Sequence, residues 1–426
     1  MSQETLTAAP VKKRLLSLDV LRGITIAGMI LVNNPGSWSY IYPPLKHAAW
    51  NGCTPTDLVF PFFVFCMGIA MYISHKKTNH ALTFPVARKI ITRGLLIVVI
   101  GWALSWLGMF LGQITTEGTT LLHAIWTYPI EHIRILGVFP RLGLVSIFGG
   151  LLMLAAKPKN CPWVAVVLMV IYCIIQSATN SFELNEQNIV SVLDVNLFGQ
   201  DHIYYGLKDA LGNKVYFDPE GLLSTIPCVA HVLIGAWMGH LIMNVKDIWG
   251  KVTRLLLAGA VMMILGFLLD YAYPINKSMW SASYVLVTCG LASSLLAILT
   301  WILDIRLPER NMLEPTTKTG KAIKWFANSW YKFFECFGVN PLFIFCLSAI
   351  VVNVMRSIKF AYEVSLCSCG DLTIVGDYNV WSFWYKVCMQ PLFGNEGGSL
   401  ACALSLVCVL WGIAYLLYRK KIYIKL

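Results

Sequence analysis

Apolar segments of membrane-spanning length follow one another along nearly the whole chain. Ten stretches come close to the roughly 20 residues that a spanning helix needs. They cover residues 17–33, 56–74, 90–111, 135–156, 162–178, 222–243, 252–272, 280–303, 336–355 and 400–418. Only 13% of the residues are charged, whereas soluble domains have about 25%. The sequence therefore predicts an all-α fold, a polytopic bundle of about ten transmembrane helices in a lipid bilayer.

Basic residues concentrate in alternate connecting segments. If both termini are cytoplasmic, 23 of the 33 Lys and Arg residues fall on the inner side and eight on the outer side. Cytoplasmic loops carry such an excess, so the pattern predicts that both ends lie inside. It also explains the net charge of +11 without a nucleic-acid partner. We expect a cytoplasmic tail over 1–16, one transmembrane domain over 17–418 and a basic cytoplasmic tail over 419–426.

Two outer connections are long, residues 179–221 and 356–399, and long loops in compact proteins are usually functional. Within the second, residues 381–393 are typical of an interfacial or re-entrant piece. Cys367, Cys369 and Cys388 share this loop, where a disulfide stays open. Most of the 13 cysteines lie in apolar runs and behave as small hydrophobic residues. Because no Cys/His cluster has metal-ligand spacing, we expect no metal.

A polar segment, residues 46–61, separates the first two apolar stretches and contains His47 and Asp57. Thr54-x-x-Asp57 with Pro55 is typical of a capped helix start, so Asp57 has a structural interpretation. A capping carboxylate is also a fixed one that could orient His47, as the acid of a catalytic triad does. An imidazole can then accept a proton near neutral pH. The alternative is an ordinary surface-loop histidine.

Further polar groups mark the same outer side. Asp218 and Glu220 precede the sixth apolar stretch, and Asn276, Lys277 and Trp280 precede the eighth. Each group can be interpreted as helix capping or interfacial anchoring. Together with His47 they are suited to lining a sugar site.

Charged and small residues inside the apolar stretches give separate expectations. Asp19 and Arg22 are three residues apart and can pair on one helix face. Arg141 has no such local partner, so we expect it to face a polar cavity or a distant acid, and to bind a phosphate group. Gly235-x-x-x-Gly239 is a close-packing pattern between membrane helices.

Several motifs together resemble one family. They are 17–23 (SLDVLRG), 32–36 (VNNPG), 46–61 (KHAAWNGCTPTDLVFP), 141–143 (RLG), 218–221 (DPEG), 276–277 (NK) and 419–421 (RKK). These motifs are similar to those of the heparan-alpha-glucosaminide N-acetyltransferase family and its bacterial relatives. The resemblance covers nearly the whole chain in order.

The resemblance implies transfer of an acetyl group from cytosolic acetyl-CoA to the amino group of an extracytoplasmic glucosamine-type sugar. His47 matches the active-site histidine, and Asn33 and Asp57 match its asparagine and aspartate partners. Trp50 and Asn51 then join the expected acceptor contacts, and Arg141 the acetyl-CoA contacts.

The location implied is a bacterial inner membrane, and the chain could form a homodimer. Direct transfer with His47 as general base and a covalent acetyl-His47 route both stay open. A secondary transporter of amino sugars or cell-wall precursors is the alternative function.

Overall fold

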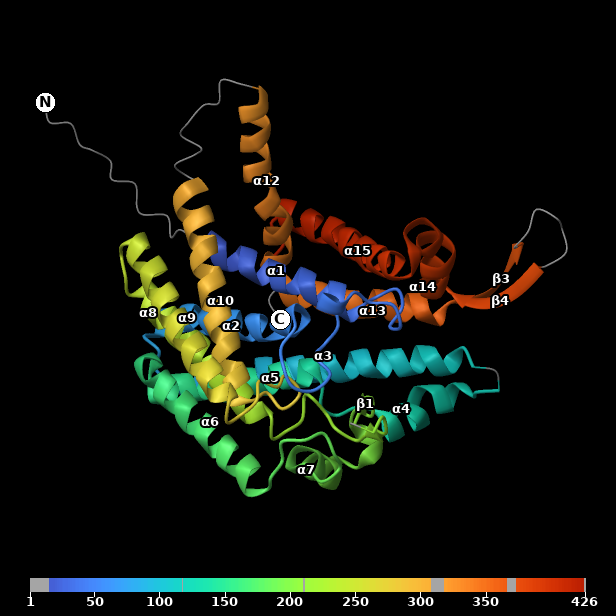
Figure 1. Cartoon of the computed structure of the whole chain (residues 1–426), viewed down its shortest axis with the longest axis horizontal. Helices are drawn as coiled ribbons and strands as arrows, with labels where there is room; N and C mark the ends of the chain where they lie inside the picture. The colour runs from blue at the N-terminus through green and yellow to red at the C-terminus, as the bar shows by residue number, and fades with distance from the viewer. Residues whose placement is uncertain (1–14, 117, 210, 308–317, 366–372, 425–426) are drawn as a thin grey trace, which may run out of the picture.

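The computed structural model describes residues 15–116, 118–209, 211–307, 318–365 and 373–424, and helices dominate it (Figure 1). The helices are α1 (Leu16–Asn33), α2 (Pro55–His75), α3 (Phe84–Ile114), α4 (Tyr128–His132), α5 (Val138–Ala156), α6 (Cys161–Ala178), α7 (Ile189–Phe198), α8 (Thr225–Met243), α9 (Ile248–Asp270), α10 (Ala282–Leu299), α12 (Lys318–Val339), α13 (Pro341–Ser357), α14 (Val380–Phe383) and α15 (Gln390–Arg419). Two antiparallel pairs, β1 (Leu207–Lys208) with β2 (Lys214–Val215) and β3 (Lys359–Ser365) with β4 (Thr373–Asn379), are the strands in this part of the chain.

Nine helices among the described residues are long and apolar enough to cross a membrane. A tenth span is a bent pair, because the end of α12 and the whole of α13 meet at 82°. Pro341 begins α13 directly after Asn340, which has a non-helical backbone conformation. Proline cannot continue the hydrogen bonding of a preceding helix. The stretch predicted over 336–355 therefore contains a break between α12 and α13, whereas the all-α multi-pass fold of about ten spans is confirmed.

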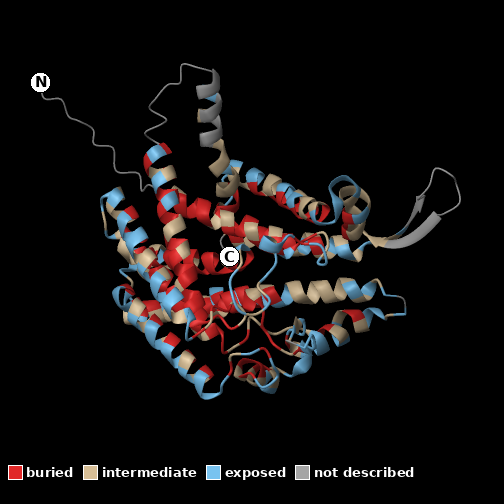
Figure 2. Cartoon of the chain, viewed as in Figure 1, coloured by how far each residue is buried: buried red, intermediate tan, exposed pale blue. Residues whose placement is uncertain are grey.

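The helices divide into a buried inner group and an outer group whose side chains face outward. Figure 2 shows buried residues concentrated along α1, α2, α8 and α10, and exposed ones along α6 and α9. The long α3 is also mostly exposed. Apolar side chains that face outward from a membrane bundle contact lipid, so the outer helices separate the inner ones from the bilayer.

Helix α2 packs closely against α8 because both contain glycine at the contact. A Cβ at Gly68 would lie 2.2 Å from the carbonyl oxygen of Val232, and one at Gly235 would lie 2.4 Å from that of Phe65. Gly239 faces Tyr72 in the same interface. The predicted close packing at Gly235 and Gly239 is confirmed. It places the residues of α2 in the centre of the bundle.

The segment between α6 and α8 is folded rather than extended. It contains α7 and the β1–β2 pair, and its Phe217 shares a small apolar core with Tyr172 of α6 and with Met279, which precedes α10. Trp50 packs edge-on against Phe217, and its indole N–H donates to the carbonyl of Phe182 at 2.9 Å. This segment therefore supports the loop that contains His47.

The second long outer segment contains β3, β4 and α14, which leads through a π-helical turn (η7, Trp384–Met389) into α15. Gly394 interrupts α15 with a φ of 74°, a left-handed conformation that glycine adopts without steric cost. Cys367 and Cys369 lie outside the described residues, and Cys388 has a free thiol.

Candidate functional site

The first turn of α2 fixes the carboxylate of Asp57 in one orientation. Its Oδ2 accepts hydrogen bonds from the backbone N–H groups of Thr54 and Ala48, both at 3.0 Å, and lies 2.9 Å from the Thr54 hydroxyl. The predicted capping role of Asp57 is confirmed. The side chain is 1% exposed, so backbone donors rather than water surround this oxygen.

A proline one turn further along gives Asp57 a second attachment. Pro61 has no N–H with which to close the helical bond to the Asp57 carbonyl. The hydroxyl of Tyr284 on α10 donates to that carbonyl at 2.6 Å instead. The start of α2 is thus tied to α10 at the position where its own hydrogen bonding is interrupted.

His47 meets the other oxygen of the same carboxylate. Its Nδ1 lies 2.6 Å from Oδ1 of Asp57, and its side chain is 42% exposed. A carboxylate only accepts hydrogen bonds, so in the neutral imidazole Nδ1 carries the proton and Nε2 has the lone pair. The pair has the arrangement of an oriented general base, as the sequence predicted: a buried acid behind an accessible imidazole.

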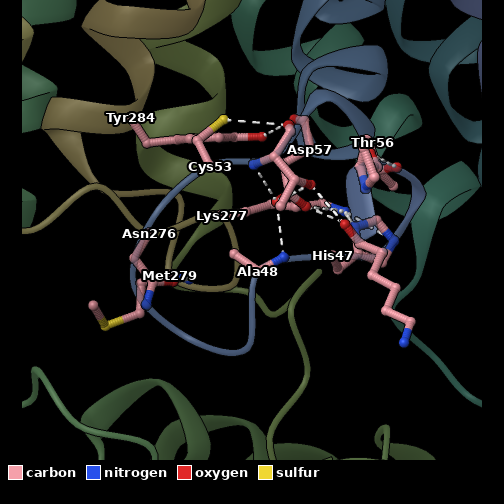
Figure 3. Close-up of polar contacts among 12 residues, drawn as sticks. His47, Ala48, Cys53, Thr56, Asp57, Asn276, Lys277, Met279 and Tyr284 are labelled. Atoms are coloured by element: carbon pink, nitrogen blue, oxygen red, sulfur yellow. Dashed lines mark hydrogen bonds and ion pairs between the residues drawn. The ribbon is translucent and has the colours of Figure 1, made fainter. Parts of the chain in front are cut away.

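Lys277 completes a three-residue cluster with His47 and Asp57 (Figure 3). Its Nζ lies 3.0 Å from Nδ1 and 3.4 Å from Nε2 of His47, and 3.5 Å from Oδ1 of Asp57. Burial lowers the pKa of Lys277 below its ordinary value, although Asp57 and Glu220 act in the opposite direction. Lys277 was expected on this side of the molecule, but its contact with the imidazole was not predicted.

Loop-to-loop contacts hold Lys277 in place. The backbone N–H of Gly52 donates to the carbonyl of Ile275 at 2.7 Å, and the side chain of Asn276 donates to that of Asn51 at 3.2 Å. Asn276 is fully buried, and its Oδ1 accepts from the backbone N–H of Met279 at 2.9 Å. Asn51 and Asn276 therefore join the two loops that carry His47 and Lys277. Their predicted contact with an acceptor stays a prediction.

A second charged cluster lies before α8. Arg134 donates to both carboxylate oxygens of Asp218 and to Glu220, the latter at 2.6 Å. Burial disfavours the charge on Arg134, but the two acids outweigh it and raise the pKa of Arg134. Burial likewise raises the pKa of Glu220, but Arg134 outweighs it and the net shift is downward. Sequence reasoning missed Arg134, because 84 residues separate it from Asp218 and no local pattern signals the pairing.

Arg141 lies on the same side of the bundle but is fully buried. One of its terminal nitrogens donates to the Gly221 carbonyl at 3.1 Å and to the Ser224 hydroxyl. Its guanidinium is 5.3 Å from the ring centroid of Trp280, which is 1% exposed. Both residues therefore belong to the protein interior, and the predicted phosphate contact of Arg141 stays a prediction.

Asn33, the last residue of α1, is exposed at the surface. In the part of the chain that the structure describes, no hydrogen bond joins it to His47 or Asp57. The structure therefore joins His47, Asp57 and Lys277 by short contacts, and the catalytic role of Asn33 stays a prediction.

A cavity of 490 Å³ lies along the opposite half of α2. Side chains of α2 from Phe63 to His75 form one wall, and α3, α5 and the α12–α13 junction form the others. Most of the lining is apolar, but Arg22 and Arg93 both face it. Arg22 also pairs with Asp19 at 3.6 Å, as predicted. The volume lies within the range of about 300–1,000 Å³ that is usual for small-molecule sites.

Comparison with known proteins identifies the family of this chain. The family model for the catalytic region of heparan-alpha-glucosaminide N-acetyltransferase matches residues 14–266, which include His47 and Asp57 but not Lys277. The Homo sapiens heparan-alpha-glucosaminide N-acetyltransferase is 27% identical over 348 residues, which is 69% of this chain and 49% of that protein. The Mus musculus enzyme of the same name is 25% identical over 343 residues, which is 69% of this chain and 50% of that protein. The chain spans about half the length of these relatives. Because the family model covers more than half of the chain, the protein belongs to the heparan-alpha-glucosaminide N-acetyltransferase family.

Proposed function

We propose that the protein is a transmembrane N-acetyltransferase that moves an acetyl group from acetyl-CoA to the amino group of a glucosamine-type sugar. The observation that carries the proposal is the His47–Asp57 pair, an exposed imidazole held by a buried carboxylate at 2.6 Å. Family membership supports the acetyl-transfer chemistry. Its location would be the inner membrane of a bacterium, with His47 on the extracytoplasmic side.

In the direct route, Nε2 of His47 accepts a proton from the sugar amine as the amine nitrogen attacks the thioester carbonyl. The C–N bond forms and the carbonyl electron pair moves to oxygen. When the C=O bond reforms, the C–S bond breaks and the imidazolium returns the proton to the CoA thiolate. Asp57 stabilises the imidazolium between these steps, because its Oδ1 already accepts from Nδ1.

The cavity on the other half of α2 is suited to the pantetheine and phosphate groups of acetyl-CoA. Its apolar wall fits the pantetheine arm, and Arg22 and Arg93 supply positive charge for phosphates. Phe63 and Asp57 are six residues apart on α2, so the cavity ends about 9 Å along the helix axis from the His47 end. One helix thus connects a co-substrate site with an acceptor site.

The decisive experiment measures thiol release from acetyl-CoA by purified protein in detergent, with glucosamine and related amino sugars as acceptors. We expect acceptor-dependent release of CoA that is lost in His47→Ala. Detergent removes any transmembrane gradient, so a transporter would release no thiol. Absence of thiol release with the whole acceptor panel, or full activity of His47→Ala, would contradict the proposal.

A rapid-mixing experiment without acceptor separates the two chemical routes. A stoichiometric burst of free CoA that disappears in His47→Ala indicates a covalent acetyl-His47 intermediate. Wild-type protein without a burst follows the direct route.

A further inference from the structure

The cation at the candidate site requires an explanation, because a lysine beside a general base opposes protonation of that base. Lys277 Nζ is nearer to His47 than to Asp57, at 3.0 Å from Nδ1 against 3.5 Å from Oδ1. Its side chain is 19% exposed. A lysine that served only as a counter-ion to Asp57 would not need to approach both imidazole nitrogens.

The hydrogen-bonding capacity of the ring limits what Lys277 can do there. Nδ1 has one proton, and the 2.6 Å contact to Asp57 uses it. The ammonium therefore has no acceptor at Nδ1, but besides its 3.5 Å contact with Oδ1 of Asp57 it lies 3.4 Å from Nε2, so it borders the space in front of that nitrogen. That space is where an attacking amine must lie, within hydrogen-bond distance of Nε2.

Three other polar side chains that could stabilise a negative charge lie elsewhere. Arg134 is engaged by Asp218 and Glu220, and Arg141 is buried against Trp280. Asn33 is exposed, and within the described residues it has no hydrogen bond to His47. Among the described residues, Lys277 has an ammonium 3.4 Å from Nε2, the reacting nitrogen of the imidazole.

From this geometry we infer that Lys277 is a catalytic residue whose ammonium stabilises the negative oxygen of the tetrahedral intermediate. The inference rests on the proposed acetyl transfer at His47. When the amine nitrogen bonds to the thioester carbon, the carbonyl oxygen gains the electron pair and becomes an alkoxide on that same carbon. Lys277, at 3.4 Å from Nε2, is close enough to donate an N–H to it. The charge returns to the C=O bond as the C–S bond breaks.

Such stabilisation acts on kcat, since the negative oxygen exists only after attack. Loss of one preorganised donor at this kind of position lowers kcat by about 10²–10³-fold. A lysine that only bound the ground-state sugar would instead raise KM. These two roles for Lys277 therefore differ in a measurable quantity.

The test compares Lys277→Met and Lys277→Arg with Lys46→Met in the full chain in detergent. Lys46 is an exposed lysine next to His47, so its substitution removes one positive charge from the loop that contains His47. We expect kcat to fall by about 10²–10³-fold in Lys277→Met, with KM for glucosamine nearly unchanged. Lys277→Arg should retain most of the activity, and Lys46→Met should match wild type.

A rescue experiment separates a catalytic role from a folding defect. Trimethylammonium carries one N–H donor and cannot be converted to a stable amide. We expect it to restore part of the kcat of Lys277→Ala in a saturable manner, and to leave His47→Ala inactive. Unchanged acetyl-CoA affinity in both variants would show that the fold is intact.

The results that would overturn the inference are distinct from those that would overturn the proposed function. If His47→Ala is inactive while Lys277→Met keeps its kcat or changes only KM, the inference about Lys277 alone is wrong. Loss of kcat in Lys277→Met without any rescue of Lys277→Ala also contradicts it. If His47→Ala stays fully active, both the inference and the proposed function are wrong.

Discussion

The two halves of α2 differ in the kind of ligand environment that they form. At the N-terminal end, Asp57 is fixed by Thr54, Ala48 and His47, and its backbone carbonyl is held by Tyr284. At the other half, from Phe63 to His75, the helix forms the wall of a mostly apolar cavity. The first end is organised by hydrogen bonds and the second by shape. The contrast suggests that chemistry belongs to the first end and co-substrate binding to the second.

Asp57→Asn tests the chemical end and should give the largest effect. An amide nitrogen facing His47 would favour the tautomer with the proton on Nε2, which cannot accept a proton from the amine. In a Ser-His-Asp triad the corresponding change lowers kcat by about 10⁴-fold, and we expect a loss of about 10³–10⁴-fold in thiol release here. Acetyl-CoA affinity should not change.

Asp270→Asn is the matched control for this substitution, because Asp270 accepts from the backbone N–H of Ile275 at 2.6 Å without an ion pair to His47. It should keep most of the activity. Equal losses in the two variants would mean that Asp57 acts only through loop structure, and would remove the distinction between the ends of α2.

The cavity end is tested by Arg93→Gln, which should act on binding rather than on chemistry. Hydrogen bonds to charged groups contribute about 1.5–3 kcal/mol, so we expect KM for acetyl-CoA to rise by about tenfold or more, with little change in kcat. Arg88→Gln is the control. Arg88 is an exposed residue of the same helix, α3, and it does not line the cavity. A kcat defect without a KM defect in Arg93→Gln would contradict this assignment.

Sequence reasoning predicted the features that depend on residues close together in the chain. The capping of Asp57 follows from Thr54, three residues away, and the spans follow from apolar length. The contact between Lys277 and His47 joins residues 230 positions apart, and the pairing of Arg134 with Asp218 joins residues 84 apart. Such contacts depend on how the outer loops pack, which local patterns do not encode. Sequence reasoning therefore paired Asp57 with His47 but did not predict that Arg22 and Arg93 line a cavity.

At the chemical end, we expect pH to change activity less than the substitutions above do. Burial lowers the pKa of Lys277 below the ordinary value of 10.5. As pH rises through that lowered value, Lys277 loses its charge. The pH at which wild-type kcat/KM falls to half of its maximum should therefore lie below 10.5. Lys277→Arg should abolish this alkaline decline, because a guanidinium stays protonated. Profiles of the two proteins from pH 7 to 10 measure the difference, and identical declines would exclude Lys277 as the group responsible.

Tyr284→Phe should have the smallest effect on activity. The substitution removes the hydroxyl that donates to the Asp57 carbonyl, which Pro61 leaves without its helical partner. An unsatisfied buried carbonyl costs about 1–3 kcal/mol, so we expect a measurable drop in thermal stability in detergent. Asp57 keeps its side-chain hydrogen bonds to Thr54, Ala48 and His47. Because a change in kcat requires a changed interaction with the transition state, kcat should stay within about twofold of wild type. A large loss of kcat at normal stability would show that the tie between α2 and α10 takes part in the chemistry, and that Pro61 marks a functional joint between the two halves of α2.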